Sequence, residues 1–296
     1  MAEKLTPRRI ASRKHRRAAA KRSRADRQAA PRPTPRVRHH VHLAFDAAWG
    51  DTPPATPAQA LQEQGRTDHF AVSYDTRLGE AGRVIANYLV QACEYDFNNV
   101  SALFGTRPQA LPFHVAVVYS AAGAWHPVPC SNSNIYIGAL SANPPNPLFL
   151  RSLMVSEMIE VFAADPGTAW ACDKSTGDGL SRVLADALVP NQKPINFVTA
   201  PFWLDSPRVN WVDSTDDSDR NLPSTGCAVL FLNWLHYQLS KLWPDIARAG
   251  RATLAETYKV LNADGTDGWN QFHSLLDARY PLGQPSNVTS DNVFPL

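Results

Sequence analysis

The sequence has few of the residues on which several specialised protein classes depend. It contains four cysteines in 296 residues, and no two of them form a C-x-x-C pair. A thiolate zinc site or a thioredoxin-like motif is therefore not expected. No apolar run reaches the roughly 18 to 20 residues that a transmembrane helix needs. We expect buried free thiols, and disulfides are the alternative, among the four cysteines Cys93, Cys130, Cys172 and Cys227.

Motifs for nucleotide binding and for serine hydrolysis are also absent. The sequence contains neither G-x-G-x-x-G nor G-x-x-x-x-G-K-[ST], the two glycine loops that hold phosphates in common nucleotide-binding folds. It also lacks the G-x-S-x-G turn that presents the nucleophile of α/β-hydrolases. These absences direct attention to sites built from acids and histidines.

Acidic residues are scarce at the N-terminus. Residues 1–40 contain 14 Lys and Arg but only Glu3 and Asp26, a net charge of +12, and this leaves −10 for the other 256 residues because the whole chain carries +2. The segment has no aromatic residue and too few aliphatic ones to offset the entropy of folding. We expect a disordered basic arm that binds a polyanion through residues 4–38, with a solubilising extension as the alternative. No apolar stretch follows the basic residues, so no secretory signal is indicated and a cytoplasmic location is favoured.

The rest of the chain has the patterns of a mixed α+β protein. Residues 41–66 are expected to be a linker with a short strand at 41–46 and a turn-rich stretch at 50–65. Strands are predicted by β-branched and aromatic residues at 69–75, 112–120 and 134–140.

Helical spacing of apolar residues predicts a long helix over 80–104, which Gly105 ends. Further helices are predicted at 148–165, 179–188, 224–243, and near 251–262 and 268–279, with irregular structure over 191–222. The order predicts an N-terminal subdomain over 67–165 and a mostly helical C-terminal subdomain over 166–296.

One predicted helix, "FLRSLMVSEMIEVFAAD" at 149–165, carries an unusual polar arc. Apolar residues cover most of its circumference, and Ser156, Glu157 and Glu160 share the remaining arc. Glu157 and Glu160 are i,i+3 neighbours that repel each other when both are ionised. A bound cation, a shared proton or a basic partner would relieve that repulsion, and an arc facing water is the alternative.

The spacing S-E-x-x-E matches the H-E-x-x-H motif, in which two histidines bind zinc and the glutamate activates water. A helix ending in "LFG" and the strands "PFHVAVVYS" and "NIYIGAL" precede it, and "STGDGLSRVLADAL" follows. In this order of elements the chain resembles the gluzincin metallopeptidases over roughly residues 68–243. The resemblance implies a zincin-like fold, in which a small twisted sheet with an edge strand packs on the active-site helix. It places Ser156, Glu157 and Glu160 at the first histidine, the general base and the second histidine, and Asp178 at the third ligand.

Both zinc histidines of that family are thus replaced. An oxygen-only metal set of Ser156, Glu160 and Asp178 would suit Ca²⁺, Mg²⁺ or Mn²⁺ better than Zn²⁺. The resemblance also implies a downstream oxyanion-stabilising group, for which His236 and Tyr237 are candidates; aromatic residues on a half-buried helix are the alternative. Substitute zinc ligands could come from His126, in the loop between the two strands, or from His114.

Three functions follow as hypotheses. The first is a metallopeptidase-like protein without zinc chemistry that binds a peptide by strand addition along 134–140. The second is an active hydrolase that uses Glu157, Glu160 and Asp178 as a carboxylate or hard-metal site. The third is a nucleic-acid-associated protein that acts through its basic arm.

Overall fold

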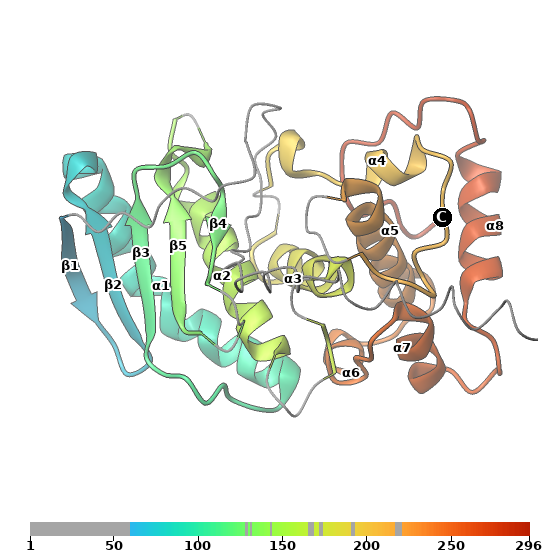
Figure 1. Cartoon of the computed structure of the whole chain (residues 1–296), viewed down its shortest axis with the longest axis horizontal. Coiled ribbons are helices and arrows are strands. Elements are labelled where there is room, and N and C mark those ends of the chain that lie inside the picture. Colours follow the sequence, from blue (N-terminus) through green and yellow to red (C-terminus); the bar gives the residue numbers. More distant parts are fainter. Residues whose placement is uncertain are drawn as a thin grey trace, which may run out of the picture. The chain divides into compact units, whose positions relative to one another are not determined.

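The computed structural model describes residues 60–127, 130, 132–142, 144–164, 169–171, 174–190, 193–216 and 221–296. The described residues from 60 onward belong to one compact unit. The predicted basic arm and the predicted strand at 41–46 are therefore not described. The described part is an α+β fold with a five-stranded mixed sheet and eight α-helices (Figure 1).

The sheet has the strand order β1-β2-β3-β5-β4. Its three central strands, β2, β3 and β5, run parallel, and the two outer strands, β1 and β4, each run antiparallel to their neighbour. The strands are β1 (Leu61–Arg66), β2 (Phe70–Asp75), β3 (Phe113–Val118), β4 (Ala124–Trp125) and β5 (Asn134–Gly138).

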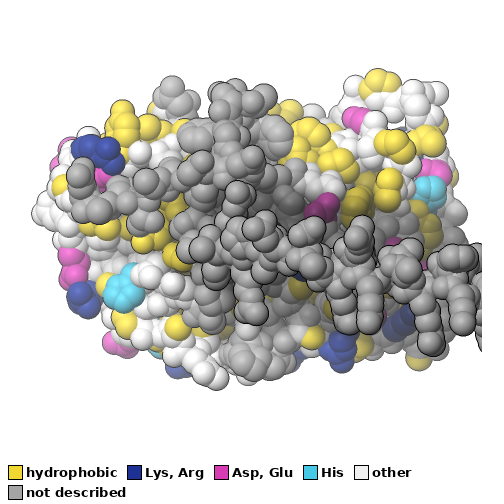
Figure 2. Space-filling view, in the orientation of Figure 1, with side chains coloured by type: hydrophobic (Ala, Val, Ile, Leu, Met, Phe, Trp, Pro, Cys, Tyr) yellow, Lys and Arg dark blue, Asp and Glu magenta, His cyan; other side chains and the backbone are white. Residues whose placement is uncertain are grey.

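Side chains alternate between the two faces of this sheet. Val115 and Val117 of β3 belong to the main hydrophobic core, and Ala116 and Val118 belong to a small separate cluster with Trp125. The main core lies where α1 (Gly79–Phe104) and α2 (Pro147–Ala163) cover one face of the sheet (Figure 1). The opposite face carries charged and histidine side chains among hydrophobic ones (Figure 2).

The remaining helices form the C-terminal part of the fold. The helix α3 (Ser175–Leu188) packs on α2 and on α5 (Leu222–Asn233). Gly179 allows α3 to approach α5 closely, since a Cβ at this position would lie only 2.6 Å from the Cβ of Ala228. Short helices complete the fold: α4 (Ala200–Leu204), α6 (Trp243–Arg248), α7 (Leu254–Leu261) and α8 (Trp269–Arg279), with single 3₁₀ turns at η2 (Thr76–Leu78), η3 (Ala139–Ser141) and η4 (Ile195–Phe197).

Most predicted elements are confirmed within a few residues. The long helix α1 ends at Gly105 as predicted, in the left-handed conformation with φ of 73°. The α7 helix starts with a capping box between Thr253 and Glu256. Every helix among the described residues is too short or too polar to cross a membrane.

Four predictions are wrong in detail. Residues 61–66 form β1 instead of a loop; this strand is polar and largely exposed, so it has no hydrophobic alternation to reveal it. The strand at 134–138 is not at the edge, because β4 pairs with Tyr136 and Ile137 on its outer side. The segment 191–222 contains η4 and α4. The predicted helix over 224–243 ends instead in a π-helical turn, Trp234–Gln238, and α6 begins at Trp243 with a proline in its first turn.

Candidate functional site

The helix that carries the S-E-x-x-E sequence is buried on nearly every side. Asn146 caps its N-terminus by accepting hydrogen bonds from the backbone N–H groups of Leu148 and Phe149, and Pro147 occupies the first turn. From Ser152 to Ala163 every residue is buried. The arc of Ser156, Glu157 and Glu160 therefore does not face water: Glu157 is 0% exposed and Glu160 is 3% exposed.

A histidine lies beside the two glutamates. The Nδ1 atom of His126 donates a hydrogen bond to Oε2 of Glu157 over 2.7 Å, and the same Nδ1 lies 3.9 Å from Oε2 of Glu160. His126 is itself 0% exposed. One basic partner thus stands against two buried carboxylates, which relieves part of the repulsion that the i,i+3 spacing creates.

The alternation of the edge strand explains how His126 reaches this position. Ala124 belongs to the main core on the helix side of the sheet, and Trp125 belongs to the small cluster on the other side. The next residue, His126, returns to the helix side, where α2 presents Glu157. The histidine is therefore placed by the backbone of β4, the outermost strand at this end of the described sheet.

A second hydroxyl connects the predicted metal ligands. The Ser181 hydroxyl of α3 accepts a hydrogen bond from the Ser156 hydroxyl over 3.1 Å and lies 2.9 Å from Oε1 of Glu160, to which it donates. The backbone carbonyl of Asp178 is a further acceptor for Ser181 at 3.0 Å. The side chains of Ser156 and Glu160 thus meet at Ser181, whereas Asp178, which is also buried, contacts Ser181 through its backbone carbonyl and not through its carboxylate.

Cys130 follows the edge strand closely and is disulfide-bonded, whereas Cys93 and Cys227 are free. The prediction of free thiols is confirmed for Cys93 and Cys227 and is wrong for Cys130. The ligand-type atoms of His126, Cys130 and Glu160 nevertheless lie within 4.8 Å of one another, and all three residues are buried. A sulfur cannot serve a disulfide and a metal as thiolate together, so the two uses of Cys130 exclude each other.

A second, partly buried polar cluster lies next to the first and includes residues of α3. The Nζ atom of Lys193 lies 2.7 Å from Oδ2 of Asp186 and 2.7 Å from Oδ2 of Asp291. Asp291 also accepts hydrogen bonds from the backbone N–H groups of Thr199 and Ala200. Burial raises the pKa of Asp291, but Lys193 and Arg182 outweigh that effect, so its pKa lies below the usual value.

The two clusters adjoin across a small cavity of about 20 Å³, whose lining includes Ser156, Arg182 and Lys193. For Lys193, burial lowers the pKa, but the two aspartates outweigh it and hold the pKa above its ordinary value. Lys193 is therefore held in its charged form by its own partners.

The other candidate residues have their contacts elsewhere. His236 donates from Nδ1 to the carbonyl of Lys241 over 2.7 Å and stacks on Trp243 with ring centroids 4.1 Å apart. Tyr237 is 41% exposed. Both lie in the π-helical turn, and none of their described contacts joins them to Glu157, so their role at the oxyanion stays a prediction.

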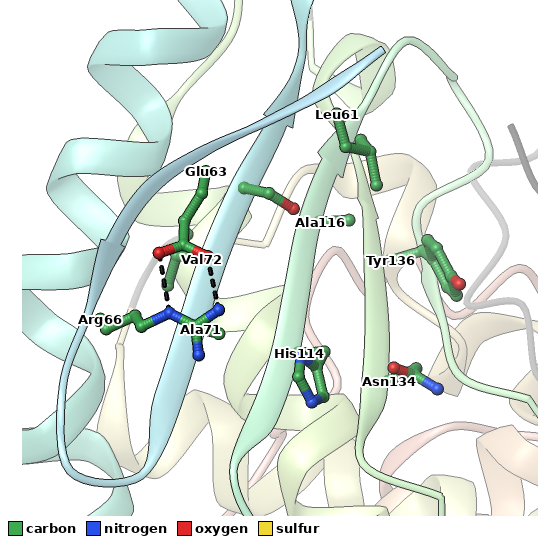
Figure 3. A pocket seen from close by; sticks show the side chains of 10 residues that line it. Leu61, Glu63, Arg66, Ala71, Val72, His114, Ala116, Asn134 and Tyr136 are labelled. Atoms are coloured by element: carbon green, nitrogen blue, oxygen red, sulfur yellow. Dashed lines mark hydrogen bonds and ion pairs between the residues drawn. The ribbon is translucent and has the colours of Figure 1, made fainter. Parts of the chain in front are cut away.

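His114 projects from the sheet face opposite α2. It lines a shallow pocket of about 260 Å³ together with an exposed ion pair of Glu63 and Arg66, and with Asn134 and Tyr136 (Figure 3). Since Val115, its neighbour in β3, faces the main core, His114 faces away from it. It therefore does not replace a missing zinc histidine.

Sequence reasoning missed two members of the site. Ser181 lies three residues after Asp178 on the same face of α3, and that spacing was the one signal that could have found it. Cys130 carried no recognised motif: His126 lies close to it in the sequence, but Glu160 comes from a separate helix. Comparison of the chain with protein-family models, with curated proteins and with solved structures found no match.

Proposed function

We propose that this chain is a divergent zincin-like protein that binds an extended peptide and does not carry out zinc-peptidase chemistry. Three features support the fold part of this proposal. In chain order, α1, β3 and β5 come before α2, α2 carries S-E-x-x-E, and α3 with Asp178 packs on α2. The resemblance to gluzincins rests on this order of elements.

The observation that carries the loss of peptidase chemistry is the position of Glu157. A general base must reach the water or substrate proton that it removes. Glu157 is instead fully buried, and its Oε2 accepts a hydrogen bond from His126. Ser156 and Glu160, which stand where the zinc ligands would be, are bonded to Ser181.

Peptide binding is supported by the register of β4. The N–H of Gly138 donates to the carbonyl of Gly123, so residues 123 and 138 form a hydrogen-bonded pair of the antiparallel ladder. The next such pair is Trp125 with Tyr136, and Ala124 falls between them. The backbone N–H and C=O of Ala124 therefore point away from β5, toward the outer side of β4. Because Ala124 is 0% exposed, a peptide strand can add there only after the part of the protein that covers this edge moves aside.

The test uses the full chain and an immobilised library of unstructured ten-residue peptides. Binding is read by interferometry and cleavage by mass spectrometry. We expect binding without cleavage. Ala124→Pro removes the outward N–H and should abolish binding, and proline is tolerated on an edge strand where its N–H would face outward. Because Ala124 is buried in the core, circular dichroism must show that this variant is folded before its binding is compared. The matched control Ala124→Ser keeps the N–H and should bind normally; binding unchanged in Ala124→Pro would overturn the proposal.

An active hydrolase is the second candidate, and one observation favours it. The carboxylates of Glu157 and Glu160 lie 2.7 Å and 3.9 Å from Nδ1 of His126. Three side chains that can exchange protons are thus close together, as acid–base catalysis requires. Cleavage products that disappear in a folded Glu157→Gln variant would establish this function in place of the first. Polyanion binding by residues 4–38 lies outside the described residues and stays a prediction.

A further inference from the structure

The group of His126, Cys130 and Glu160 brings together three different kinds of metal ligand. An imidazole, a sulfur and a carboxylate each offer one atom, and these atoms lie within 4.8 Å of one another. The three residues come from the end of β4, from the segment before β5 and from α2, so the fold brings them together from separate elements. All three are buried, and the cluster is therefore part of the interior and not an exposed acidic patch.

We propose that His126, Cys130 and Glu160 form a zinc site that opens when the disulfide of Cys130 is reduced. A set of nitrogen, sulfur and oxygen ligands suits Zn²⁺, whereas the oxygen-only set expected from the sequence suits harder cations. The three ligand atoms must draw together by a fraction of their present spacing to meet zinc at the usual bond lengths of about 2.0 to 2.3 Å.

Glu157 gives the histidine the support that metal-binding histidines usually have. A ligating histidine commonly donates its other ring N–H to a carboxylate, which fixes the tautomer and orients the ring. Here Nδ1 of His126 donates to Glu157, and either ring nitrogen can satisfy the 4.8 Å spacing of the group. We assign the metal to Nε2, because binding there keeps the hydrogen bond from Nδ1 to Glu157. Ser181 orients Glu160 in the same way by donating to Oε1, while Oε2 lies on the side of His126.

Charge favours a cation at this place. Two carboxylates with 0% and 3% exposure lie beside His126, and ionised acids in the interior need a compensating charge or a proton. A thiolate at Cys130 would add a further negative charge. A divalent cation bound between these groups would interact favourably with all of them.

In this proposal the redox state of the Cys130 disulfide controls zinc binding. A dithiol reductant gives two electrons to the S–S bond of Cys130, both released sulfurs take up a proton, and the reductant closes to its own disulfide. Zn²⁺ then displaces the proton of the Cys130 thiol and binds the thiolate. In the oxidised protein the site keeps two of its three ligands, so its zinc affinity is low.

This inference goes beyond the proposed function, because neither peptide binding nor cleavage is part of it. A zinc ion held here would leave Glu157 bonded to the histidine ligand and away from a metal-bound water. Either proposal can fail without the other.

The experiment compares oxidised and reduced full-length protein. The reduced sample is treated with dithiothreitol, which is removed under nitrogen before titration with Zn²⁺ or with Co²⁺ as its spectroscopic substitute. We expect about one zinc ion per chain in the reduced protein, at least about tenfold tighter than in the oxidised protein, and a thiolate-to-cobalt charge-transfer band in the reduced protein alone. Equal zinc affinity in both states, or reduced wild-type protein without that band, would overturn the proposal.

Variants assign the ligands. Cys130→Ser and His126→Gln should each lose zinc binding in the reduced state, and Glu157→Gln should weaken it by roughly 10- to 100-fold as an outer partner does. Cys130→His should bind zinc without reduction, since an imidazole needs no reductant. Circular dichroism checks that each variant is folded. If a variant does not fold, the presence or absence of the thiolate-to-cobalt band in the reduced wild-type protein still decides the proposal.

Cys93→Ser is the matched control. Burial raises the pKa of the Cys93 thiol to about 11, and burial also raises the pKa of Cys227, so neither offers a thiolate at neutral pH. Reduced Cys93→Ser should therefore bind zinc like the wild type. A loss of binding in this variant would contradict the assignment to Cys130.

Discussion

Two polar clusters beside α3 differ in the balance of charge among their described residues. Lys193 and Arg182 stand against Asp186 and Asp291 in one cluster, the balanced cluster, so its described cations and anions match. In the other, the acid-rich cluster, the described charged side chains are two acids, Glu157 and Glu160, and one base, His126. We expect the contacts of the balanced cluster to be structural. The acid-rich cluster is the place where we propose that an ion from outside binds.

The largest effect is expected where the balanced cluster is broken. Asp291→Asn removes one of the two anions beside Lys193 and weakens the acceptor of two backbone hydrogen bonds, so Lys193 keeps only the partly exposed Asp186 as its carboxylate partner among the described residues. Breaking a buried pair costs about 3 to 5 kcal/mol, and because Asp186 remains we expect a loss at the lower end of that range. Urea unfolding should show this loss as a lower midpoint.

The control is an exposed pair of similar chemistry. Glu80→Gln breaks the pair of Glu80 with Arg83, whose side chains are 68% and 52% exposed. Its unfolding midpoint should stay within error of the wild type. If Asp291→Asn were equally harmless, the balanced cluster would not be structural and the comparison would fail.

An acid titration gives the next largest effect. The pKa of Asp291 is lowered because Lys193 and Arg182 outweigh burial, and the pKa of Asp75 is lowered chiefly by hydrogen bonds from Arg77. A carboxyl with a lowered folded pKa stabilises the protein above its unfolded pKa near 3.8, and this stability is lost as the pH falls through the folded pKa.

The free energy of unfolding should therefore fall below about pH 5, by at most about 1.4 kcal/mol per pH unit for each group. Unfolding curves between pH 7 and pH 3 measure this slope. The slope should be shallower in Asp291→Asn, and an identical slope in that variant would show that Asp291 is not one of the groups responsible.

The smallest change in the free energy of unfolding is expected in the acid-rich cluster, and it should have the opposite sign to the change in Asp291→Asn. Glu160→Gln keeps an oxygen for Ser181 and removes one of two neighbouring negative charges. In metal-free protein this should leave the free energy of unfolding unchanged or raise it by up to about 1 kcal/mol, because like charges at i,i+3 repel. The same acid-to-amide change is thus expected to act in opposite directions in the two clusters. A loss of several kcal/mol in Glu160→Gln would mean that this cluster is structural as well.

The sequence predicted the elements with strong local patterns and missed those set by partners. Helices α1 and α2 and strands β2, β3 and β5 were found because apolar residues repeat at their periods. The polar strand β1 forms because β2 offers a hydrogen-bonding edge, and no pattern within Leu61–Arg66 reports that edge. The end of α5 depends on the π-helical turn before Pro244, which apolar periodicity does not register.

The sequence predicted which site residues share one face of α2, but not which residues of other elements contact that face. The spacing within α2 correctly indicated that Glu157 and Glu160 share one arc, but not whether that arc faced water or the interior. His126 lies 31 residues before Glu157 in the sequence. It meets the polar arc of α2 because the pairing of β4 with β5 directs its side chain to the helix side of the sheet. Cys130 and Ser181 come from still other elements, so their meeting with Glu160 is a property of tertiary packing.

The segment Ala124–His126 belongs both to the edge of the sheet and to the buried acid centre. A peptide that pairs with Ala124 and an ion that binds His126 would act on the same three residues of backbone. If binding of one ligand changes the affinity for the other, the second must change the affinity for the first by the same factor. The edge strand would then be the shared element through which the redox state of Cys130 sets how tightly a peptide is held.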